Sequence, residues 1–464
     1  MTLGQTSQSG IAVDSETIVA LGTAPGRGAI AVVRMSGDRA IEIAARHITP
    51  WPTEARVTRL CTVHHGSKAL DQAIVTFYVA PASFTGENTV ELFTHGGYVV
   101  PTSVMAAFID SGAREALPGE FTRRAVLNGK LDIVQAEAIG DLVDARSSAM
   151  QQTALYQLDG GLSSRITSVR EGILGVESLI AYDLDFPEED DGSISTTRII
   201  EAADVLLESL DLLLSTIPLG QIVRGGAIVV IAGEPNTGKS SLFNALVGEA
   251  RAIVTEISGT TRDAIEAVVE MNRWPIRLID TAGLRRSDDI VERLGIEMSE
   301  RHISAAHLVI ACGDTEASLG KAVGVISSLS TASIVPVLTK GDLRASTGFE
   351  AQSSDYSSAS ISVSAATGEG FERLRSEIEF VLGRRYGDIT PETPILTRAW
   401  HIHGIQRARD EVQQFRNIWE GDLFPASIAA VHLRSAAVAL EGLIGAISAD
   451  DVLNRVFSSF CVGK

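Results

Sequence analysis

Residues 233–240 read Gly-Glu-Pro-Asn-Thr-Gly-Lys-Ser, which is a complete phosphate-binding loop. An apolar run precedes it at 227–232 and a helical pattern follows it at 241–247. This is the strand-loop-helix context that the motif requires. In such a loop, backbone N–H groups curl around phosphate oxygens, Lys239 reaches the terminal phosphates, and the Ser240 hydroxyl ligates Mg²⁺. The sequence therefore predicts a nucleotide-binding loop rather than a chance glycine-rich turn.

Four shorter motifs follow this loop in the order of a GTPase, at 259–263, 280–283, 339–342 and 364–365. Asp280 comes at the end of an apolar run, where it is placed to hold Mg²⁺ through water, and Gly283 is free to sense a γ-phosphate. Asp342 can accept two hydrogen bonds from guanine N1–H and N2–H₂, a pattern that adenine does not offer. The ordered set favours a GTPase over an ATPase.

The residue after Gly283 is Leu284, where many GTPases carry a glutamine that orients the attacking water. Leucine cannot do this, so hydrolysis needs another device. Asn236 could bind a monovalent cation beside the phosphates, where the cation would offset developing charge. The carboxylate of Glu292 could position water, or Glu292 could be an ordinary solvent-facing helix residue.

Length and composition exclude several classes of protein. The chain has 464 residues, enough for about three domains, and its 45% hydrophobic residues argue against disorder. No uninterrupted apolar stretch approaches the roughly 18 residues of a membrane span, so we expect a cytoplasmic protein without a membrane anchor. Three scattered cysteines imply neither a disulfide framework nor a metal knuckle. A net charge of −19 means that nucleic acid must meet a local basic patch or arrive through a partner.

The pattern of predicted secondary structure changes three times along the chain, which predicts a multidomain protein. An α+β pattern at the N-terminus gives way to helices, then to alternating α/β, and helices return after Pro394. The economical interpretation is an α/β P-loop domain inserted into an all-α domain, because insertions are tolerated where chain ends lie together at a surface. An acidic run at 185–192 is expected to be a solvated helix connection rather than a metal site. The predicted domains are 1–129, 130–222, 223–385 and 386–464, the second and fourth forming one helical domain.

The motifs resemble those of one family, the MnmE (TrmE) tRNA uridine-modification GTPases of the TrmE-Era-EngA-like class. The resemblance rests on the loop extended to Ser241, Gly-Thr-Thr-Arg-Asp at 259–263, Asp-Thr-Ala-Gly-Leu-Arg at 280–285 and Phe-Cys-Val-Gly-Lys at 460–464. Further matches in the first domain lie at 24–28, 84–88, 90–92, 95–97, 118–122 and 127–132. The family usually has asparagine where this chain has Thr339, which we interpret as weaker GTP affinity rather than lost specificity.

The resemblance implies a fold, an activity and partners. The first domain would bind a one-carbon tetrahydrofolate and form a homodimer, and the inserted domain would be a K⁺-activated GTPase using Mg²⁺ and GTP/GDP. With an FAD-dependent partner of the MnmG (GidA) family in a hetero-oligomer, the chain would install a one-carbon-derived aminomethyl-type modification on the wobble uridine of certain tRNAs.

The resemblance also implies roles for individual residues. Glu292 and Cys461 would be catalytic. Folate would meet Arg34, Glu91, Lys130 and Lys464, Mg²⁺ would meet Ser240 and Thr261, and K⁺ would meet Asn236, Thr255, Ile257 and Thr260. The residues expected to bind GTP are Asn236, Thr237, Gly238, Lys239, Ser240, Ser241, Thr255, Glu256, Ile257, Ser258, Gly259, Thr260, Thr261, Asp280, Thr281, Ala282, Gly283, Thr339, Lys340, Asp342, Ser364 and Ala365.

Three alternatives stay open at the level of sequence. The chain could instead be a ribosome-assembly or scaffold GTPase, although such a protein would carry a basic RNA-binding module. Cys461 could be a reactive thiol or simply a buried cysteine. The best local basic cluster could bind nucleic acid or be a solvated helix face; its members are Arg398, His401, His403, Arg407 and Arg409.

Overall fold

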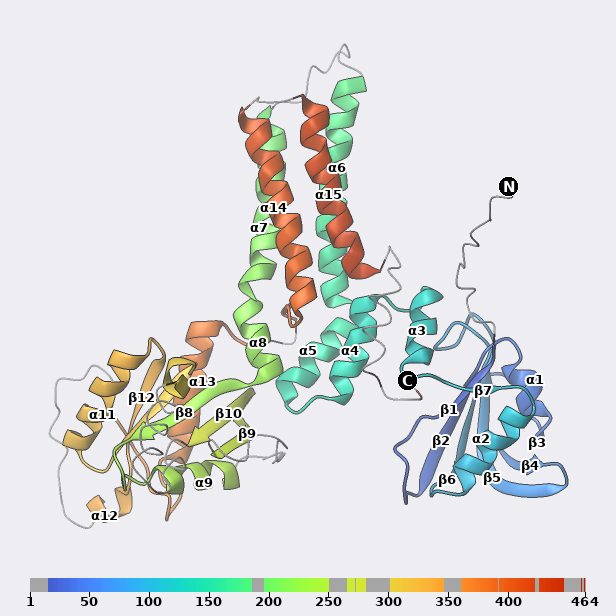
Figure 1. Ribbon diagram of the computed structural model, residues 1–464, viewed down its shortest axis with the longest axis horizontal. Coiled ribbons are helices and arrows are strands. Elements are labelled where there is room, and N and C mark those ends of the chain that lie inside the picture. Colours follow the sequence, from blue (N-terminus) through green and yellow to red (C-terminus); the bar gives the residue numbers. More distant parts are fainter. Residues whose placement is uncertain are drawn as a thin grey trace, which may run out of the picture. The chain divides into compact units, whose positions relative to one another are not determined.

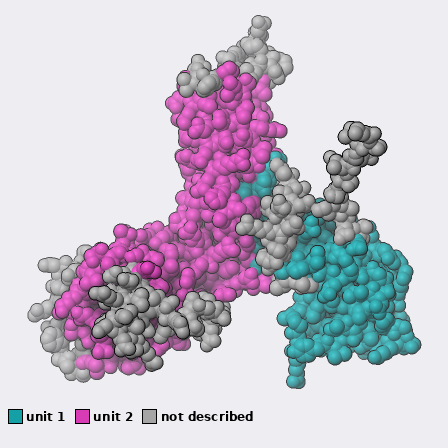
Figure 2. All heavy atoms as spheres, viewed as in Figure 1, with its two compact units in different colours: residues 1–140, 441–464 teal, residues 141–440 magenta. Residues whose placement is uncertain are grey.

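The computed structural model describes residues 16–185, 196–249, 265–271, 273–280, 301–345, 360–390, 392–421, 425–445, 460 and 463. The chain divides into two compact units (Figure 2). Unit 1 comprises residues 1–140 and 441–464, and unit 2 comprises residues 141–440. The predicted acidic connection at 185–192 falls almost wholly outside the described residues.

Unit 1 contains a seven-stranded sheet in the order β3-β4-β5-β6-β2-β1-β7. Its neighbouring strands are antiparallel except for the parallel pair β1 and β7. The strands are β1 (Ile18–Leu21), β2 (Ile30–Ser36), β3 (Ile48–Thr49), β4 (Arg59–His65), β5 (Lys68–Tyr78), β6 (Thr89–His95) and β7 (Arg114–Glu115). The helices are α1 (Ala40–Ala45), α2 (Val100–Asp110), α3 (Glu120–Leu127) and α4 (Ile133–Val143).

The sheet of unit 1 has one buried face and one more open face. Alternate residues of β2, such as Val33 and Met35, are fully buried in the cluster that includes Val104 and Phe108 of α2, as the two-residue period of a strand requires. On the opposite face, Phe121 of α3 packs with buried residues of β1. The side chains of Arg34 and its cross-strand partner Glu91 lie on this second face.

The helices of unit 2 are α5 (Ser148–Leu158), α6 (Gly161–Asp185), α7 (Thr196–Ser215), α8 (Ile217–Gly225), α14 (Ala399–Gly421) and α15 (Ala426–Ile444). Among the long ones, α7 packs against α6 and α14 (Figure 1), and α15 contacts α14. Within the described chain, 196–225 and 426–444 are long and apolar enough to cross a membrane by length and composition alone. The apolar side of α7 is buried through Ile199, Leu206 and Leu210, and Asp211 of α7 pairs with Arg409 of α14. A helix of a packed bundle therefore accounts for the apolar residues of α7.

The α/β part of unit 2 is a six-stranded sheet in the order β13-β12-β11-β8-β10-β9. All neighbours are parallel except the antiparallel pair β9 and β10. The strands are β8 (Ala227–Gly233), β9 (Ile265–Met271), β10 (Trp274–Asp280), β11 (Leu308–Gly313), β12 (Ser333–Leu338) and β13 (Ile361–Ser362), and the helices are α9 (Lys239–Glu249), α11 (Glu316–Leu329), α12 (Gly341–Ala345) and α13 (Phe371–Tyr386).

The predicted fold class is confirmed. The α/β segment from β8 to α13 lies in sequence between α8 and α14, so it interrupts the helical domain as the changes of pattern indicated. Apolar residues of α8, such as Leu219 and Ile222, belong to the same buried cluster as Val229 of β8 and Ile276 of β10. The inserted domain is therefore attached through shared core packing as well as through its two chain connections.

Candidate functional site

The phosphate-binding loop joins the end of β8 to the start of α9. Gly233 has a φ of +156°, and a Cβ there would lie 2.2 Å from the carbonyl oxygen of Cys312 on the neighbouring strand β11, so only glycine fits. Lys239 is only 6% exposed and donates from Nζ to the carbonyl oxygen of Glu234 at 2.7 Å. Its ammonium group is thus held across the loop, where phosphate oxygens would replace that carbonyl.

A hydroxyl and a carboxylate meet beside the loop. The Ser240 hydroxyl donates to Oδ2 of Asp280 at 2.8 Å, and Asp280 is fully buried at the end of β10. Asp280 ends β10, and Ser240 lies in the first turn of α9, which follows the loop that leaves the neighbouring parallel strand β8. The carboxyl ends of these two strands share one edge of the sheet, which brings the two oxygens together. Hard oxygen donors of this kind fit Mg²⁺. The sequence predicted Ser240 as a Mg²⁺ ligand and Asp280 as a residue that holds the ion through water, and the structure brings these two side chains together.

A cavity of about 300 Å³ lies next to the loop. Asp342 lines it, and Oδ1 of this residue accepts a hydrogen bond from Ser364 Oγ at 2.7 Å, which orients the carboxylate. Lys340 donates to the carbonyl oxygen of Asn236 at 2.9 Å and to Oδ2 of Asp314 at 3.0 Å. The residues that line the cavity are Gly238, Ser241, Leu242, Thr339, Lys340, Asp342, Val363, Ala365 and Ala366. The cavity is therefore placed to hold the base when phosphates occupy the loop.

Several predicted site residues fall outside the described part of the chain. They are Thr255, Glu256, Ile257, Ser258, Gly259, Thr260, Thr261, Thr281, Ala282, Gly283, Glu292, Cys461 and Lys464.

Asn236, the predicted K⁺ ligand, lies within the described residues. It is exposed and has a φ of +61°, a backbone region that asparagine tolerates better than most residues. Its side chain makes no hydrogen bond to the described residues.

The predicted folate residues Arg34 and Glu91 form a second polar site, in unit 1, on the face of the sheet that carries α3. The Arg34 guanidinium contacts Oε1 of Glu91 through Nε at 2.8 Å and through a terminal nitrogen at 2.7 Å. It also lies 5.6 Å from the ring centroid of Phe84 and 5.8 Å from that of Phe121, within the range of cation–π attraction. Both contacts to Glu91 go to one carboxylate oxygen. The other, Oε2, can accept hydrogen bonds from a ligand.

Lys130, the third predicted folate residue, contacts the loop between β5 and β6 that carries Phe84. Asn128 donates from Nδ2 to the carbonyl oxygen of Thr85 at 2.7 Å, and Lys130 donates to that of Pro81 at 3.2 Å. Gly86 has a φ of +78°, and a Cβ there would lie 2.9 Å from Cβ of Asn128. The loop carrying Phe84 is therefore clamped against the loop carrying Lys130, which brings two predicted motifs together.

A buried ion-pair network behind this site was not foreseen. Arg124, 5% exposed, contacts Glu120 at 2.9 Å and Glu87 at 3.0 Å. Glu120 also accepts from Arg114 and from the backbone N–H of Leu117. Burial alone would raise the pKa of Glu120, but the hydrogen bonds from Arg114, Leu117 and Arg124 outweigh it and lower the pKa to about 2. Glu120 and Arg124 stand four residues apart on α3, a spacing that could have signalled this pair, whereas Glu87 comes from a distant segment and no local pattern signals its contact.

The C-terminal tail, which belongs to unit 1, contacts the rest of that unit through Phe460 and Gly463. A Cβ on Gly140 of α4 would lie 3.0 Å from the Phe460 ring, so the missing side chain makes room for that ring. Gly463 has a φ of +96°, and a Cβ there would lie 2.4 Å from the carbonyl oxygen of Leu21. Leu21 pairs with Val33, the residue before Arg34. Gly463 therefore lies at the end of β1, the neighbour of the strand that carries Arg34.

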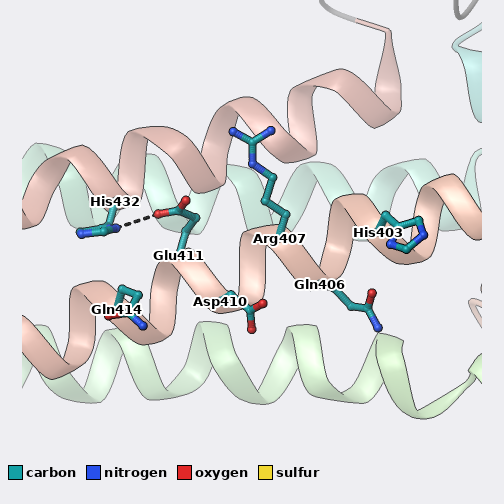
Figure 3. Close-up of a pocket in the computed structure, with 7 residues that line it drawn as sticks. All are labelled: His403, Gln406, Arg407, Asp410, Glu411, Gln414 and His432. Atoms are coloured by element: carbon teal, nitrogen blue, oxygen red, sulfur yellow. Dashed lines mark hydrogen bonds and ion pairs between the residues drawn. The ribbon is translucent and has the colours of Figure 1, made fainter.

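The five residues of the local basic cluster at 398–409 do not gather into one basic patch. Arg398 pairs with Asp141 at 2.7 Å, Arg409 pairs with Asp211 at 3.0 Å, and His401 is buried. Only His403 and Arg407 line a common groove, and they share it with acidic and amide side chains (Figure 3). In that groove, His432 of α15 contacts Glu411 at 2.7 Å. The groove has mixed charge, which does not favour a phosphate backbone.

Comparison with known proteins identifies the family. The pattern of the GTP-binding protein TrmE N-terminus matches residues 17–130, and that of the MnmE helical domain matches residues 133–461. The chain belongs to the MnmE family of tRNA modification GTPases. The tRNA modification GTPase MnmE of Azoarcus sp. (strain BH72) is 38% identical over 455 residues, covering 97% of this chain and 98% of that protein. The MnmE of Aquifex aeolicus (strain VF5) is 36% identical over 454 residues, covering 97% of this chain and all of its own length.

Membership of this family makes the chain a GTPase of tRNA modification, as the motifs predicted. The alternative of a ribosome-assembly or scaffold GTPase has no observation in its favour.

Proposed function

We propose that this chain is a K⁺-activated GTPase that modifies the wobble uridine of certain tRNAs with an aminomethyl-type group derived from a one-carbon tetrahydrofolate. An FAD-dependent partner of the MnmG (GidA) family would act with it in a cytoplasmic hetero-oligomer. The observation that carries the folate part of this proposal is the cross-strand Arg34–Glu91 pair, bordered by Phe84 and Phe121.

The chemistry of the unit 1 site fits a folate. A pterin has an edge of N–H groups that can donate hydrogen bonds to a carboxylate such as that of Glu91. Its flat ring system can stack on an exposed aromatic side chain. Phe84 is 38% exposed, and Arg34 and Lys130 supply positive charge for the carboxylates of the glutamate tail. The folate, when bound, would supply the one-carbon unit, and these residues would orient it.

Binding of a one-carbon tetrahydrofolate to the purified chain, measured by calorimetry, tests this site. Losing a hydrogen bond to a charged group costs about 1.5–3 kcal/mol, so Glu91→Ala should weaken folate binding by roughly tenfold or more. Glu115→Ala, which removes an exposed carboxylate from β7 of the same unit, should bind folate normally. GTP hydrolysis should be normal in both variants. Unchanged folate affinity in Glu91→Ala would rule out this site.

The proposed K⁺ site involves Asn236, because this exposed residue stands in the phosphate-binding loop and its amide oxygen is a suitable ligand for a monovalent cation. A bound cation would supply transition-state charge of the kind that an arginine finger gives, which is worth on the order of 10³ or more in rate. We expect GTP hydrolysis to be much faster in K⁺ than in Na⁺, and Asn236→Ala to remove the difference with GTP binding largely intact. Equal rates in the two salts would exclude the mechanism.

A further inference from the structure

A two-stranded hairpin runs from the nucleotide site to the helical domain. Strand β9 begins at Ile265, shortly after the predicted Mg²⁺ ligand Thr261, and β10 ends at Asp280, which accepts the hydrogen bond from Ser240. The two strands pair along their whole length, from Ile265 opposite Asp280 to Met271 opposite Trp274. Each has seven residues, so at roughly 3.3 Å per residue the far end of the hairpin lies about 20 Å from the Mg²⁺ ligands.

The far end of the hairpin contacts the start of α5. Oε1 of Glu270 accepts hydrogen bonds from the backbone N–H of Ser148 at 2.9 Å and from the Ser148 hydroxyl. Ser148 is the first residue of α5, so its N–H has no partner within the helix. A carboxylate at this position also interacts favourably with the helix dipole. The inserted domain therefore supplies part of the N-terminal capping of a helix in the surrounding domain.

The rest of α5 is also held by the inserted domain and its return connection. Ala149, 1% exposed, lies in the same buried cluster as Trp274 and Ile276 of β10. Near the other end of the helix, Gln157 donates to the carbonyl oxygen of Ile395 at 3.0 Å, and this hydrogen bond is buried. Ile395 lies between α13 and α14, in the chain that returns from the inserted domain. Helix α5 thus contacts both the hairpin and the return segment.

We propose that the Glu270–Ser148 contact transmits the nucleotide state of the GTPase domain to α5, and that Glu270 is a positioning residue for tRNA modification. Paired antiparallel strands move together, so a shift at the Mg²⁺ ligands displaces Glu270. Helix α5 then follows, or it loses two hydrogen bonds at its N-terminus. The inference rests on the proposed function only where tRNA modification is the readout.

Hydrogen exchange of the full-length chain tests the link directly. Protection of the α5 amides, residues 148–158, is compared with GDP and with a non-hydrolysable GTP analogue, both with K⁺ and Mg²⁺. In the wild type we expect protection to differ between the two nucleotides. In Glu270→Ala this difference should disappear. Glu270→Gln, which retains an oxygen able to accept both hydrogen bonds, should restore much of it.

Glu266 offers a matched control. It lies four residues earlier on β9, so its side chain is on the same side of the strand, and it contacts Arg277 of β10 at 2.7 Å. Glu266→Ala therefore removes a carboxylate and an ion pair without touching α5. It should keep the nucleotide-dependent protection of α5.

Activity gives a second, separable readout. Couplings between sites are usually worth about fivefold or more, so Glu270→Ala should slow tRNA modification by at least that factor while GTP hydrolysis stays within about twofold. Ser148→Ala should act in the same direction, and the double variant should be no worse than Glu270→Ala, because both changes break one contact. A normal melting temperature shows that the variants fold.

Two results would overturn the link: unchanged nucleotide-dependent protection of α5 in Glu270→Ala, or additive effects of the two substitutions. A chain that shows the α5 response but does not modify tRNA would contradict the proposed function and leave the link standing.

Discussion

At the scale of single residues, Thr339 stands where the sequence resemblance implied an asparagine, and the structure gives this threonine a role. Its hydroxyl donates to the carbonyl oxygen of Thr237 in the phosphate-binding loop at 2.5 Å. The carbonyl oxygen of Gly313 is a second, more distant acceptor for the same hydroxyl, at 3.2 Å. Thr339 is 3% exposed, so water cannot easily replace this contact. The hydroxyl therefore ties the base-binding segment to the phosphate-binding loop.

Replacing Thr339 with valine should weaken the binding of GDP and GTP alike. Valine keeps the shape of threonine but leaves a buried carbonyl oxygen unpaired, at a cost of about 1–3 kcal/mol. We expect roughly a tenfold loss of affinity, measured by titration with a fluorescent nucleotide. Thr393→Val, which removes an exposed hydroxyl that contacts Thr390, is the control. Normal nucleotide affinity in Thr339→Val would show that the hydroxyl is dispensable.

His307 gives the stability of unit 2 a pH dependence. Its Nδ1 accepts a hydrogen bond from the backbone N–H of Ile228 at 2.9 Å, so the ring must be neutral. Burial lowers the pKa of His307, and the positive charges of Arg385 and Arg277 lower it further. Because the unfolded chain then binds the proton more readily than the folded chain, stability is full above about pH 6.5 and falls as the pH drops below it.

The test is to compare His307→Gln with the wild type. Glutamine can accept the same hydrogen bond but does not titrate, so the urea midpoint of the variant should fall less between pH 7 and pH 5, by up to one proton's worth of slope. Identical slopes in His307→Gln and the wild type would remove His307 as the cause.

At the scale of elements, the described residues of the C-terminal tail, Phe460 and Gly463, each contact the rest of unit 1. A side chain at 463 would meet the carbonyl oxygen of Leu21, and the φ of +96° there is unfavourable for other residues. Gly463→Ala should therefore displace the tail end, which carries Cys461 and Lys464. We expect loss of folate binding and of tRNA modification with GTP hydrolysis retained.

Calorimetry with the folate and a GTPase assay on the same preparation check the tail prediction. Gly129→Ala is a useful comparison, because Gly129 also has a positive φ of +65° but a Cβ there meets nothing within 4 Å. That variant should bind folate nearly normally.

Cys461→Ser tests whether the thiol of the tail acts chemically or only packs. We expect this variant to lose tRNA modification and to keep GTP hydrolysis. Loss of both activities would indicate a folding role for Cys461.

What the sequence could predict follows from the range of the interactions. Motifs at strand ends, such as the loop 233–240 and Asp280, were predicted because the strand, turn and ligand are neighbours in the chain. The Glu270–Ser148 contact joins residues 122 positions apart, and no local pattern encodes it. For a related reason, the sequence left the basic cluster at 398–409 open between a nucleic-acid surface and a solvated helix face. Residues close together in a helical sequence point in different directions, so Arg398 and Arg409 meet acidic partners on other helices.

At the scale of the whole molecule, the open face of the unit 1 sheet bears on the proposed homodimer. Cross-strand register places Leu60 beside Ile74, Ile74 beside Phe93, and Phe93 beside Val32. Leu60 is 62% exposed and Ile74 is 46% exposed. An apolar strip of this kind marks an association surface more often than it marks free surface. It adjoins Arg34 and Glu91 on the same face, so a second copy bound there would also border the proposed folate site.

A charge in this strip should separate the dimer. Ile74→Glu would bury a carboxylate without a partner if the strip is the interface, and such burial is strongly unfavourable. We expect sedimentation at micromolar concentration to show a dimer for the wild type and a monomer for Ile74→Glu. Ile109→Glu changes an isoleucine that is 39% exposed, but on α2, which packs against the other face of the sheet, and it should remain a dimer. A dimeric Ile74→Glu would move the interface away from this strip, and a monomeric wild type would contradict the homodimer itself.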